Sequence, residues 1–167
     1  MDYSPLRYPG GKTKIAPLVN FIIEKAGIKQ GIYIEAFAGG AGVALALLLN
    51  NKVDNIVIND IDIAIYAFWY SVLNYTGEFV QLVKDTPVTI EEWRKQKGIF
   101  ISKNQENLLE LGFATFFLNR TNRSGILKAG PIGGLDQKGN YLIDARFNKA
   151  NLIKRVERVA QYKEKIS

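Results

Sequence analysis

The sequence predicts an α/β protein that starts as a doubly wound parallel sheet and continues as a helical segment. Two β-rich runs, at 31–35 and 55–59, predict parallel strands, because a glycine-rich turn and an apolar helix lie between them. No further alternation of strand and helix follows residue 75, which predicts helices in the second half. Two strands are fewer than an ordinary open sheet has, so we expect an incomplete sheet.

The helices of the first half follow from their apolar periodicity. Residues 16–26 form an amphipathic pattern that ends at Gly27, as helices often do. The apolar run 43–49 predicts a short buried helix directly after the glycine-rich turn. Residues 63–74 predict a longer helix with several aromatic side chains, which we expect to contribute to the core.

The second half is predicted to be helical with one long loop. Thr89 and Glu92 have the spacing of a capping box, so a helix is expected to begin there and run toward residue 100. A second helix is predicted at 106–119 and a charged amphipathic helix at 151–165. Between these two, residues 121–140 are rich in glycine and are expected to form a loop.

Composition excludes several classes of function. The chain has 167 residues, 47% of them apolar and 23% charged, which is enough to form one globular core. Cys and His are absent, so disulfides, thiol nucleophiles, imidazole bases and the usual zinc sites are excluded, and no metal site is expected. Neither a run long enough to span a membrane nor a signal-peptide pattern is present, so a cytoplasmic protein without membrane contact is predicted.

The net charge of +6 is concentrated in one segment. Residues 1–75 are neutral, whereas residues 119–155 carry eight Lys and Arg against two Asp. A neutral α/β half joined to a basic segment indicates a small-molecule site in one part and a polyanion-binding surface in the other. A solvated basic loop is the alternative interpretation.

The glycine turn and the end of the second strand together predict a cofactor site. Gly39, Gly40 and Gly42 lie where a backbone could approach a ligand closely, and Asp60 follows Gly39 by 21 residues. An acidic residue at this spacing typically accepts hydrogen bonds from ribose hydroxyls. A plain tight turn with a helix-capping Asp is the alternative. Glu35, just before the turn, favours a cofactor with a positive end, such as S-adenosylmethionine, over a nicotinamide dinucleotide.

Five segments resemble, in the same order, motifs of the DNA adenine-N6 methyltransferases of the D12 class adenine methylase family: residues 5–12, 35–42, 59–62, 116–125 and 139–149. The resemblance implies an incomplete Rossmann-like sheet of an S-adenosylmethionine-dependent methyltransferase with a helical target-recognition insertion. Residues 1–75 would be the cofactor-binding half of the core, and residues 76–150 the helical DNA target-recognition domain. Residues 151–167 would be a helix that returns to the core.

The resemblance, together with the charge pattern, assigns candidate site residues. Asp60 would hold the ribose hydroxyls, Ile61 would pack on the adenine, and Glu35 would lie near the methionine end. The candidate residues for binding S-adenosylmethionine are Tyr8, Lys12, Glu35, Phe37, Gly39, Gly40, Asp60 and Ile61. The candidate residues for binding double-stranded DNA are Asn119 (DNA-contacting or structural), Arg120, Asn122, Arg123, Lys128, Lys138 and Arg146.

One departure from the family is large. Its Asp-Pro-Pro-Tyr motif accepts the amino protons of the target adenine and stacks on the flipped base. None of the five prolines here is adjacent to another, so the motif is missing and no catalytic residue is assigned. The smaller departure is at Ala41-Gly42, where many members have Gly-Ser.

We therefore expect the N-terminal part of such an enzyme, inactive alone, with a second chain or a downstream segment supplying the motif. A non-catalytic DNA- or cofactor-binding remnant and a nicotinamide-dependent oxidoreductase are the alternatives. Cytosine-C5 methylation is excluded, since it needs a cysteine nucleophile.

Overall fold

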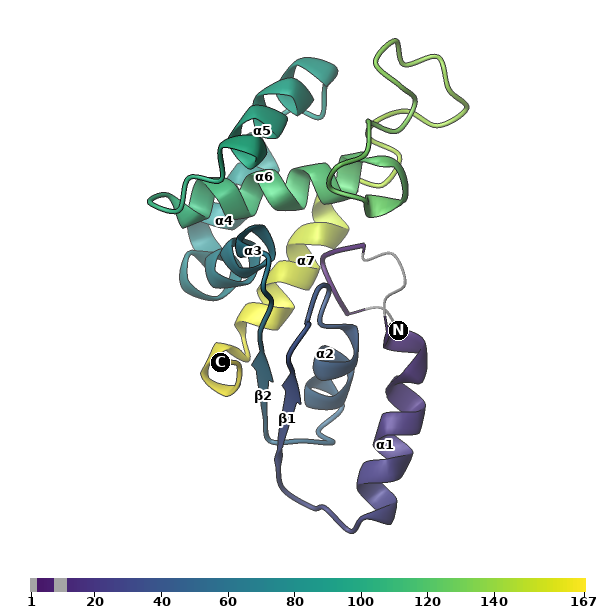
Figure 1. Cartoon of the computed structure of the whole chain (residues 1–167), viewed down its shortest axis with the longest axis vertical. Coiled ribbons are helices and arrows are strands. Elements are labelled where there is room, and N and C mark those ends of the chain that lie inside the picture. The colour runs from purple at the N-terminus through teal and green to yellow at the C-terminus, as the bar shows by residue number, and fades with distance from the viewer. Residues whose placement is uncertain (1–2, 8–11) are drawn as a thin grey trace.

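The computed structural model describes residues 3–7 and 12–167, as helices around a small parallel sheet (Figure 1). Strand β1 (Ile32–Glu35) pairs in parallel with β2 (Asn55–Ile58), and α2 (Gly42–Leu49) connects the two. Because both strands and the helix between them lie where the sequence pattern predicts them, the prediction of a mixed α/β fold with a parallel pair is confirmed. The fuller Rossmann-like architecture stays a prediction.

The end of the chain lies beside the second strand. Ile166 forms a parallel bridge with Ile56, and the backbone N–H of Ser167 donates to the Ile56 carbonyl at 3.0 Å. On the same edge the N–H of Ile58 donates to the Ser167 carbonyl at 2.8 Å. Residues 166 and 167 thus occupy a third position in the sheet, on the edge of β2 that faces away from β1.

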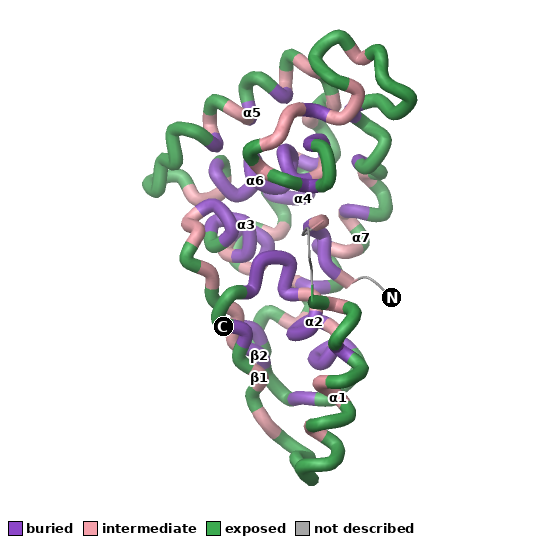
Figure 2. The backbone as a smooth tube through the Cα atoms, turned by 45° about the vertical axis from the view of Figure 1, so that its right-hand side comes forward, coloured by how far each residue is buried: buried purple, intermediate pink, exposed green. Residues whose placement is uncertain are grey.

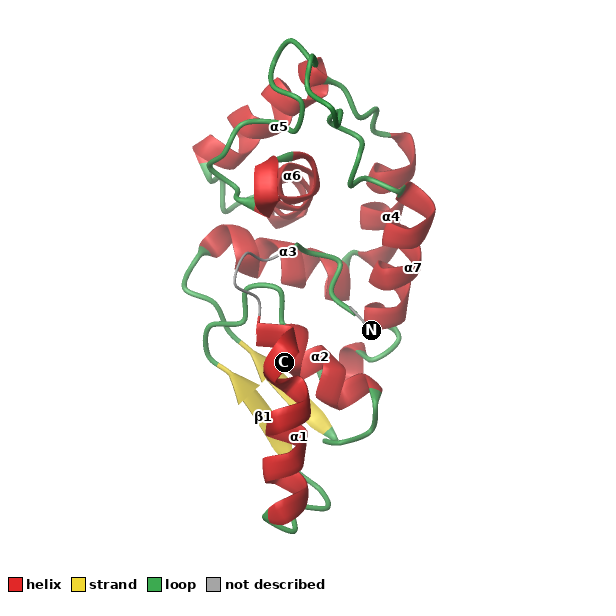
Figure 3. Cartoon of the chain, turned by 90° about the vertical axis from the view of Figure 1, so that its right-hand side faces the viewer, coloured by secondary structure: helices red, strands yellow, loops and turns green. Residues whose placement is uncertain are grey.

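Within residues 3–7 and 12–167, helices cover one face of the sheet and leave the other open. Helix α1 (Ala16–Lys25), entered through a short 3-10 turn (Lys12–Ile15), and α2 lie on the same side of the strands (Figure 3). Ile32 and Ile34 point to the opposite side and are 63% and 65% exposed. Since exposed β-branched side chains in adjacent pleats are unfavourable in water, this face is suited to being covered by further structure.

The rest of the chain is a helical assembly on top of the sheet (Figure 1). Its helices are α3 (Ile63–Asn74), α4 (Thr76–Asp85), α5 (Ile90–Ser102), α6 (Leu108–Thr121) and α7 (Lys149–Ala160). Two short 3-10 turns follow α6 and α7, at Arg123–Gly125 and Lys163–Lys165. No helix among the described residues is long and apolar enough to cross a membrane.

Most helix predictions agree with the structure, with three differences. Thr89 caps α5 as expected, since its hydroxyl oxygen accepts the N–H of Glu92 at 3.2 Å. Helix α4 was not predicted, because only its buried Phe79, Val80 and Val83 carry the periodicity, too short a pattern to identify by itself. Helix α6 begins and ends two residues later than predicted, and the final helix stops at Ala160 rather than continuing to residue 165.

Helix α3 is the element against which both parts pack. Its Phe68 ring stacks on Phe116 of α6 with centroids 6.0 Å apart, and both side chains are fully buried. The two helices approach closely at Gly112, where a Cβ atom would collide with the Ala67 carbonyl of α3. Figure 2 shows buried backbone along α2, α3 and α6. The core therefore runs from the sheet into the helical assembly through α3.

Candidate functional site

A tight turn joins β1 to α2 and lies against the end of β2. The backbone N–H of Ala38 donates to the Asn59 carbonyl at 2.8 Å, and the Asn59 amide donates to the Ala36 carbonyl at 3.1 Å. Gly39 and Ala41 have φ of 48° and 47°, in the left-handed region. These contacts hold the glycine turn at the carboxyl end of the strands, where open α/β sheets bind ligands.

Asp60 lies next to this turn and is bonded to it. Its Oδ2 atom accepts the N–H of Gly39 at 2.8 Å, and its Oδ1 atom accepts the N–H of Asp62 at 3.0 Å. An ionised carboxylate has about four lone-pair positions, so each oxygen can still accept a hydroxyl proton. The structure thus brings together the glycine turn and the acidic strand end that the sequence singled out.

Lys12 and Glu35 form a second polar group at the same turn. Lys12 Nζ lies 3.2 Å from Glu35 Oε1 and also donates to the Phe37 carbonyl at 3.0 Å. The Glu35 carboxylate is buried, and its Oε2 atom accepts the N–H of Ala44 in the first turn of α2 at 3.2 Å. A negative charge is stabilised at a helix N-terminus. Glu35 is therefore paired within the protein, and Lys12 is its half-exposed partner.

Two apolar side chains stand exposed on either side of these polar groups. Ile61 is 90% exposed and Phe37 is 72% exposed, the highest values among the large apolar side chains in the described part of the chain. Gly40 is buried in the turn between them. Tyr8 lies outside the described residues. Polar acceptors bordered by exposed apolar surface are suited to a ligand with a flat ring and a polar sugar.

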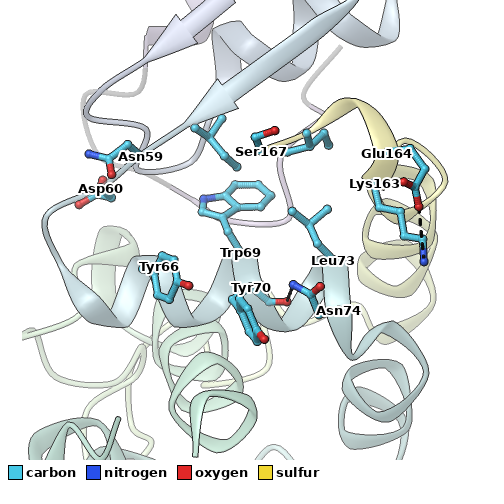
Figure 4. A pocket seen from close by; sticks show the side chains of 12 residues that line it. Asn59, Asp60, Tyr66, Trp69, Tyr70, Leu73, Asn74, Lys163, Glu164 and Ser167 are labelled. Atoms are coloured by element: carbon cyan, nitrogen blue, oxygen red, sulfur yellow. Dashed lines mark hydrogen bonds and ion pairs between the residues drawn. The ribbon is translucent and has the colours of Figure 1, made fainter.

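A cavity of about 360 Å³ adjoins Asp60 on the side of α3 (Figure 4). Tyr66, Trp69 and Tyr70 form its aromatic wall, and the end of β2 and residues 163–167 complete the lining. Trp69 is largely buried, and its indole N–H donates to the Gly39 carbonyl at 2.9 Å. The aromatic cluster, which the sequence suggested as core packing, therefore also contacts the glycine turn.

Two residues predicted to bind DNA are buried and have their amide groups occupied within the chain. Asn119 is 1% exposed and bonds the backbone N–H and carbonyl of Arg7 at 2.7 and 2.8 Å. Asn122 is fully buried, accepts the indole N–H of Trp93 at 2.6 Å, and donates to two carbonyls of the following loop. Both amides are thus occupied within the chain, which agrees with the structural alternative for Asn119, and a DNA contact by either residue stays an untested prediction.

The remaining candidates for DNA contact divide into one structural arginine and four exposed cations. Arg120 Nε donates to the Arg146 carbonyl at 2.9 Å, which joins α6 to the loop before α7. Arg123, Lys128, Lys138 and Arg146 expose their side chains on the segment between α6 and α7.

Gln137 makes the loop that carries these cations compact. Its side-chain amide donates to the carbonyls of Ile132 and Gly134 at 2.8 and 2.6 Å, and its oxygen accepts the N–H of Ile143 at 2.8 Å. The loop therefore holds its cations in a defined arrangement instead of on a mobile tail.

Sequence reasoning missed Arg7 as a candidate. Partial burial, followed by the neighbouring charge of Arg146, lowers the pKa of Arg7 below its ordinary value. Arg7 Nη1 is buried, and among the described residues no acceptor meets it. Arg7 and Arg146 therefore lie close enough for their like charges to interact. Only the fold could show this, since the two residues are far apart in the sequence.

The same region contains cations whose role is structural. Lys149 Nζ donates to the carbonyls of Lys84 and Thr86 at 2.6 and 2.8 Å, so it caps the end of α4. Arg155 donates to the Ser4 carbonyl at 2.9 Å and joins α7 to the N-terminal segment. The basic charge of residues 119–155 is therefore partly used inside the molecule.

These features define an α/β protein with a glycine turn and an acidic strand end at the carboxyl end of a parallel strand pair, and a helical part that carries exposed cations. The model of one family, D12 class N6 adenine-specific DNA methyltransferase, matches residues 8–167, so the chain belongs to this family. A comparison with curated proteins finds no match. Members of the family are methyltransferases and generally take their methyl group from S-adenosylmethionine.

Proposed function

We propose that this chain is the cofactor- and DNA-binding part of an adenine-N6 DNA methyltransferase, with S-adenosylmethionine at the glycine turn. The observation that carries the proposal is the position of Asp60, bonded to Gly39 at 2.8 Å and flanked by the exposed Ile61 and Phe37. When bound, S-adenosylmethionine supplies an electrophilic methyl group on its sulfonium. Everything that this chain contributes is binding and orientation.

The residues present fit each part of that cofactor. The free lone pairs of Asp60 suit two ribose hydroxyls, and the exposed Ile61 offers an apolar surface for a purine ring. The methionine end carries one ammonium and one carboxylate. Lys12 is half exposed and suits the carboxylate of that end, and the buried Glu35, 3.2 Å from Lys12 Nζ, holds the ammonium of Lys12 in place.

Calorimetric titration with S-adenosylmethionine, its homocysteine product and NAD tests this site. We expect the first two to bind weakly and NAD not to bind. Asp60→Ala should raise the Kd by roughly 10- to 100-fold, because it removes charge-assisted hydrogen bonds to the ribose. Asp54→Ala is the matched control: Asp54 bonds the Gly31 N–H at 3.0 Å at the opposite end of β2. Tight NAD binding would overturn the proposal in favour of an oxidoreductase.

We propose that DNA binds across the loop between α6 and α7, beside the N-terminal segment. The exposed Arg123, Lys128, Lys138 and Arg146, with Arg7 at their edge, support this, since phosphate contacts come mostly from Arg and Lys. Affinity should therefore decrease steeply with salt concentration.

Charge reversal distinguishes this surface from a general charge effect. Replacing Arg123 and Lys128 with Glu should weaken DNA binding and lower the slope of log affinity against log salt by about two. The same change at Lys29 and Lys165, which are exposed elsewhere on the chain, should have a much smaller effect. Equal losses from both pairs, measured by fluorescence anisotropy at several salt concentrations, would contradict a defined surface.

We further propose that these 167 residues do not methylate adenine without added structure. The exocyclic amine must donate hydrogen bonds to a carboxylate and a proline carbonyl beside a stacking ring, so that its lone pair can attack the methyl group, and the sequence contains no Asp-Pro-Pro-Tyr. The open face of β1, with Ile32 and Ile34 exposed, supports a further segment or second chain packing on the sheet.

A methyl-transfer assay with tritiated cofactor tests this proposal. It compares the chain alone with the chain mixed with a polypeptide that carries the motif, on unmethylated DNA. We expect turnover only in the mixture, and clear turnover by the chain alone would contradict the proposal. A chain that binds cofactor and DNA yet stays inactive in every mixture would favour a non-catalytic remnant.

A further inference from the structure

Trp69 contacts the glycine turn from the side of α3, at Gly39, the residue that also bonds Asp60. It is one of two tryptophans in the chain, lies on α3, and is only 4% exposed. Its indole N–H donates to the Gly39 carbonyl at 2.9 Å, across 30 residues of sequence. Figure 4 shows the indole directed from α3 toward the strand ends that carry Asn59 and Asp60.

Both backbone polar groups of Gly39 are therefore hydrogen-bonded to side chains. Its carbonyl accepts from Trp69, and its N–H donates to Asp60 Oδ2 at 2.8 Å. Gly39 has φ of 48°, a conformation that glycine enters and leaves at little cost. Without these two partners the Gly39 peptide groups would be less restrained, and the carboxylate of Asp60 could lose the N–H that orients it.

The orientation of the indole is itself determined by packing. Phe68 meets the Trp69 ring edge-on with centroids 4.8 Å apart, and the Phe68 ring also stacks on Phe116. Helix α3 is thus fixed by α6, and the indole N–H is aimed at the turn by the same packing that joins the two parts of the chain.

We propose that Trp69 is a positioning residue of the cofactor site, which acts through Gly39 to hold Asp60 in the geometry for the ribose. This inference rests on the proposed binding of S-adenosylmethionine at the turn. In this role Trp69 acts through its hydrogen bond to Gly39 and not through a contact of its own with the cofactor. Its hydrogen bond removes a rotation of the turn that the cofactor would otherwise have to restrict on binding.

Trp69→Phe is the test, because it keeps an aromatic ring and removes only the N–H donor and part of the ring. The Kd for S-adenosylmethionine should rise roughly five- to tenfold, as expected for one lost hydrogen bond. Trp93→Phe is the matched control, since it also loses a buried indole bond, the one to Asn122 at 2.6 Å, but far from the turn. It should lower stability and leave the Kd within about twofold.

A double-mutant cycle separates positioning from a loss of stability. If Trp69 acts through Asp60, Trp69→Phe should have little further effect on the Kd in an Asp60→Asn background. Additive effects of the two substitutions would overturn the inference. So would an unchanged Kd in Trp69→Phe while the wild-type chain binds the cofactor. If the wild-type chain itself does not bind S-adenosylmethionine, the proposed function and this inference fail together.

A measurement without ligand tests the structural part separately. In Trp69→Phe, amide hydrogen exchange at Gly39 should accelerate by about five- to tenfold relative to amides at the centre of α2, because the turn opens locally. The Trp93→Phe chain should show no such local change. Equal acceleration at Gly39 and throughout α2 would mean global destabilisation and would overturn the positioning role.

Discussion

Asn119 provides the sharpest test of how the N-terminal segment is attached. Its side chain accepts the N–H of Arg7 at 2.7 Å and donates to the carbonyls of Arg7 and Gly125 at 2.8 and 3.0 Å. Arg7 and Asn119 are 112 residues apart, so this one amide joins the start of the described chain to the end of α6. Asn119→Ala removes all three hydrogen bonds at a buried position.

The expected cost follows from those bonds. Each contributes about 1 kcal/mol net, and the groups left without partners add to the loss, so we expect destabilisation of about 3 kcal/mol. A domain of this kind is stable by about 5–15 kcal/mol, so the change is large. Asn119→Asp should cost a similar amount, because it keeps the acceptor for Arg7 and places a carboxylate oxygen against two carbonyls.

Urea denaturation followed by circular dichroism measures this cost. The midpoint should fall by about 1–2 M for Asn119→Ala. Asn74→Ala is the control, because Asn74 is exposed and bonds only the Tyr70 carbonyl of its own helix, so it should change stability by no more than about 0.5 kcal/mol. If Asn119→Ala kept its stability and lost DNA binding instead, Asn119 would be a DNA contact and the structural role would be refuted.

Three further predictions concern stability. Gly112→Ala should cost about 1–3 kcal/mol in thermal denaturation, because its Cβ would meet a backbone carbonyl of α3, whereas Gly98→Ala, with open space around it, should be neutral or stabilising. Burial and the nearby Glu35 charge raise the pKa of Tyr33 in the folded chain, so stability should decrease as pH rises through that pKa. Tyr33→Phe should flatten this alkaline loss in urea titrations at pH values around and above 10. Lys149→Met should lower the urea midpoint, since two carbonyls at the end of α4 lose their donor, whereas Lys154→Met, at an exposed position, should not.

The local pattern of residues was enough to predict most of the framework. The β-rich runs, the glycine turn and the helix between them are each encoded by neighbouring residues, and the structure shows them in place. Helix α4 was not predicted because its local pattern is weak: only three apolar side chains are buried in ten residues. The spacing of 21 residues from Gly39 to Asp60 predicted that the turn and the acidic strand end lie together, and the structure shows them hydrogen-bonded. Their role in binding a cofactor stays a prediction.

Pairings across long stretches of sequence were decided by the tertiary structure alone. By itself the sequence determined which residue types were available: a glycine turn, an acidic strand end, and an excess of cations after α6. It could not show that Asn119 turns inward to Arg7, or that Trp69 supports Gly39. The two pairs of partners lie 112 and 30 residues apart in the sequence. Whether they come into contact depends on how α3 and α6 pack, and the apolar periodicity of a single helix carries no information about that packing.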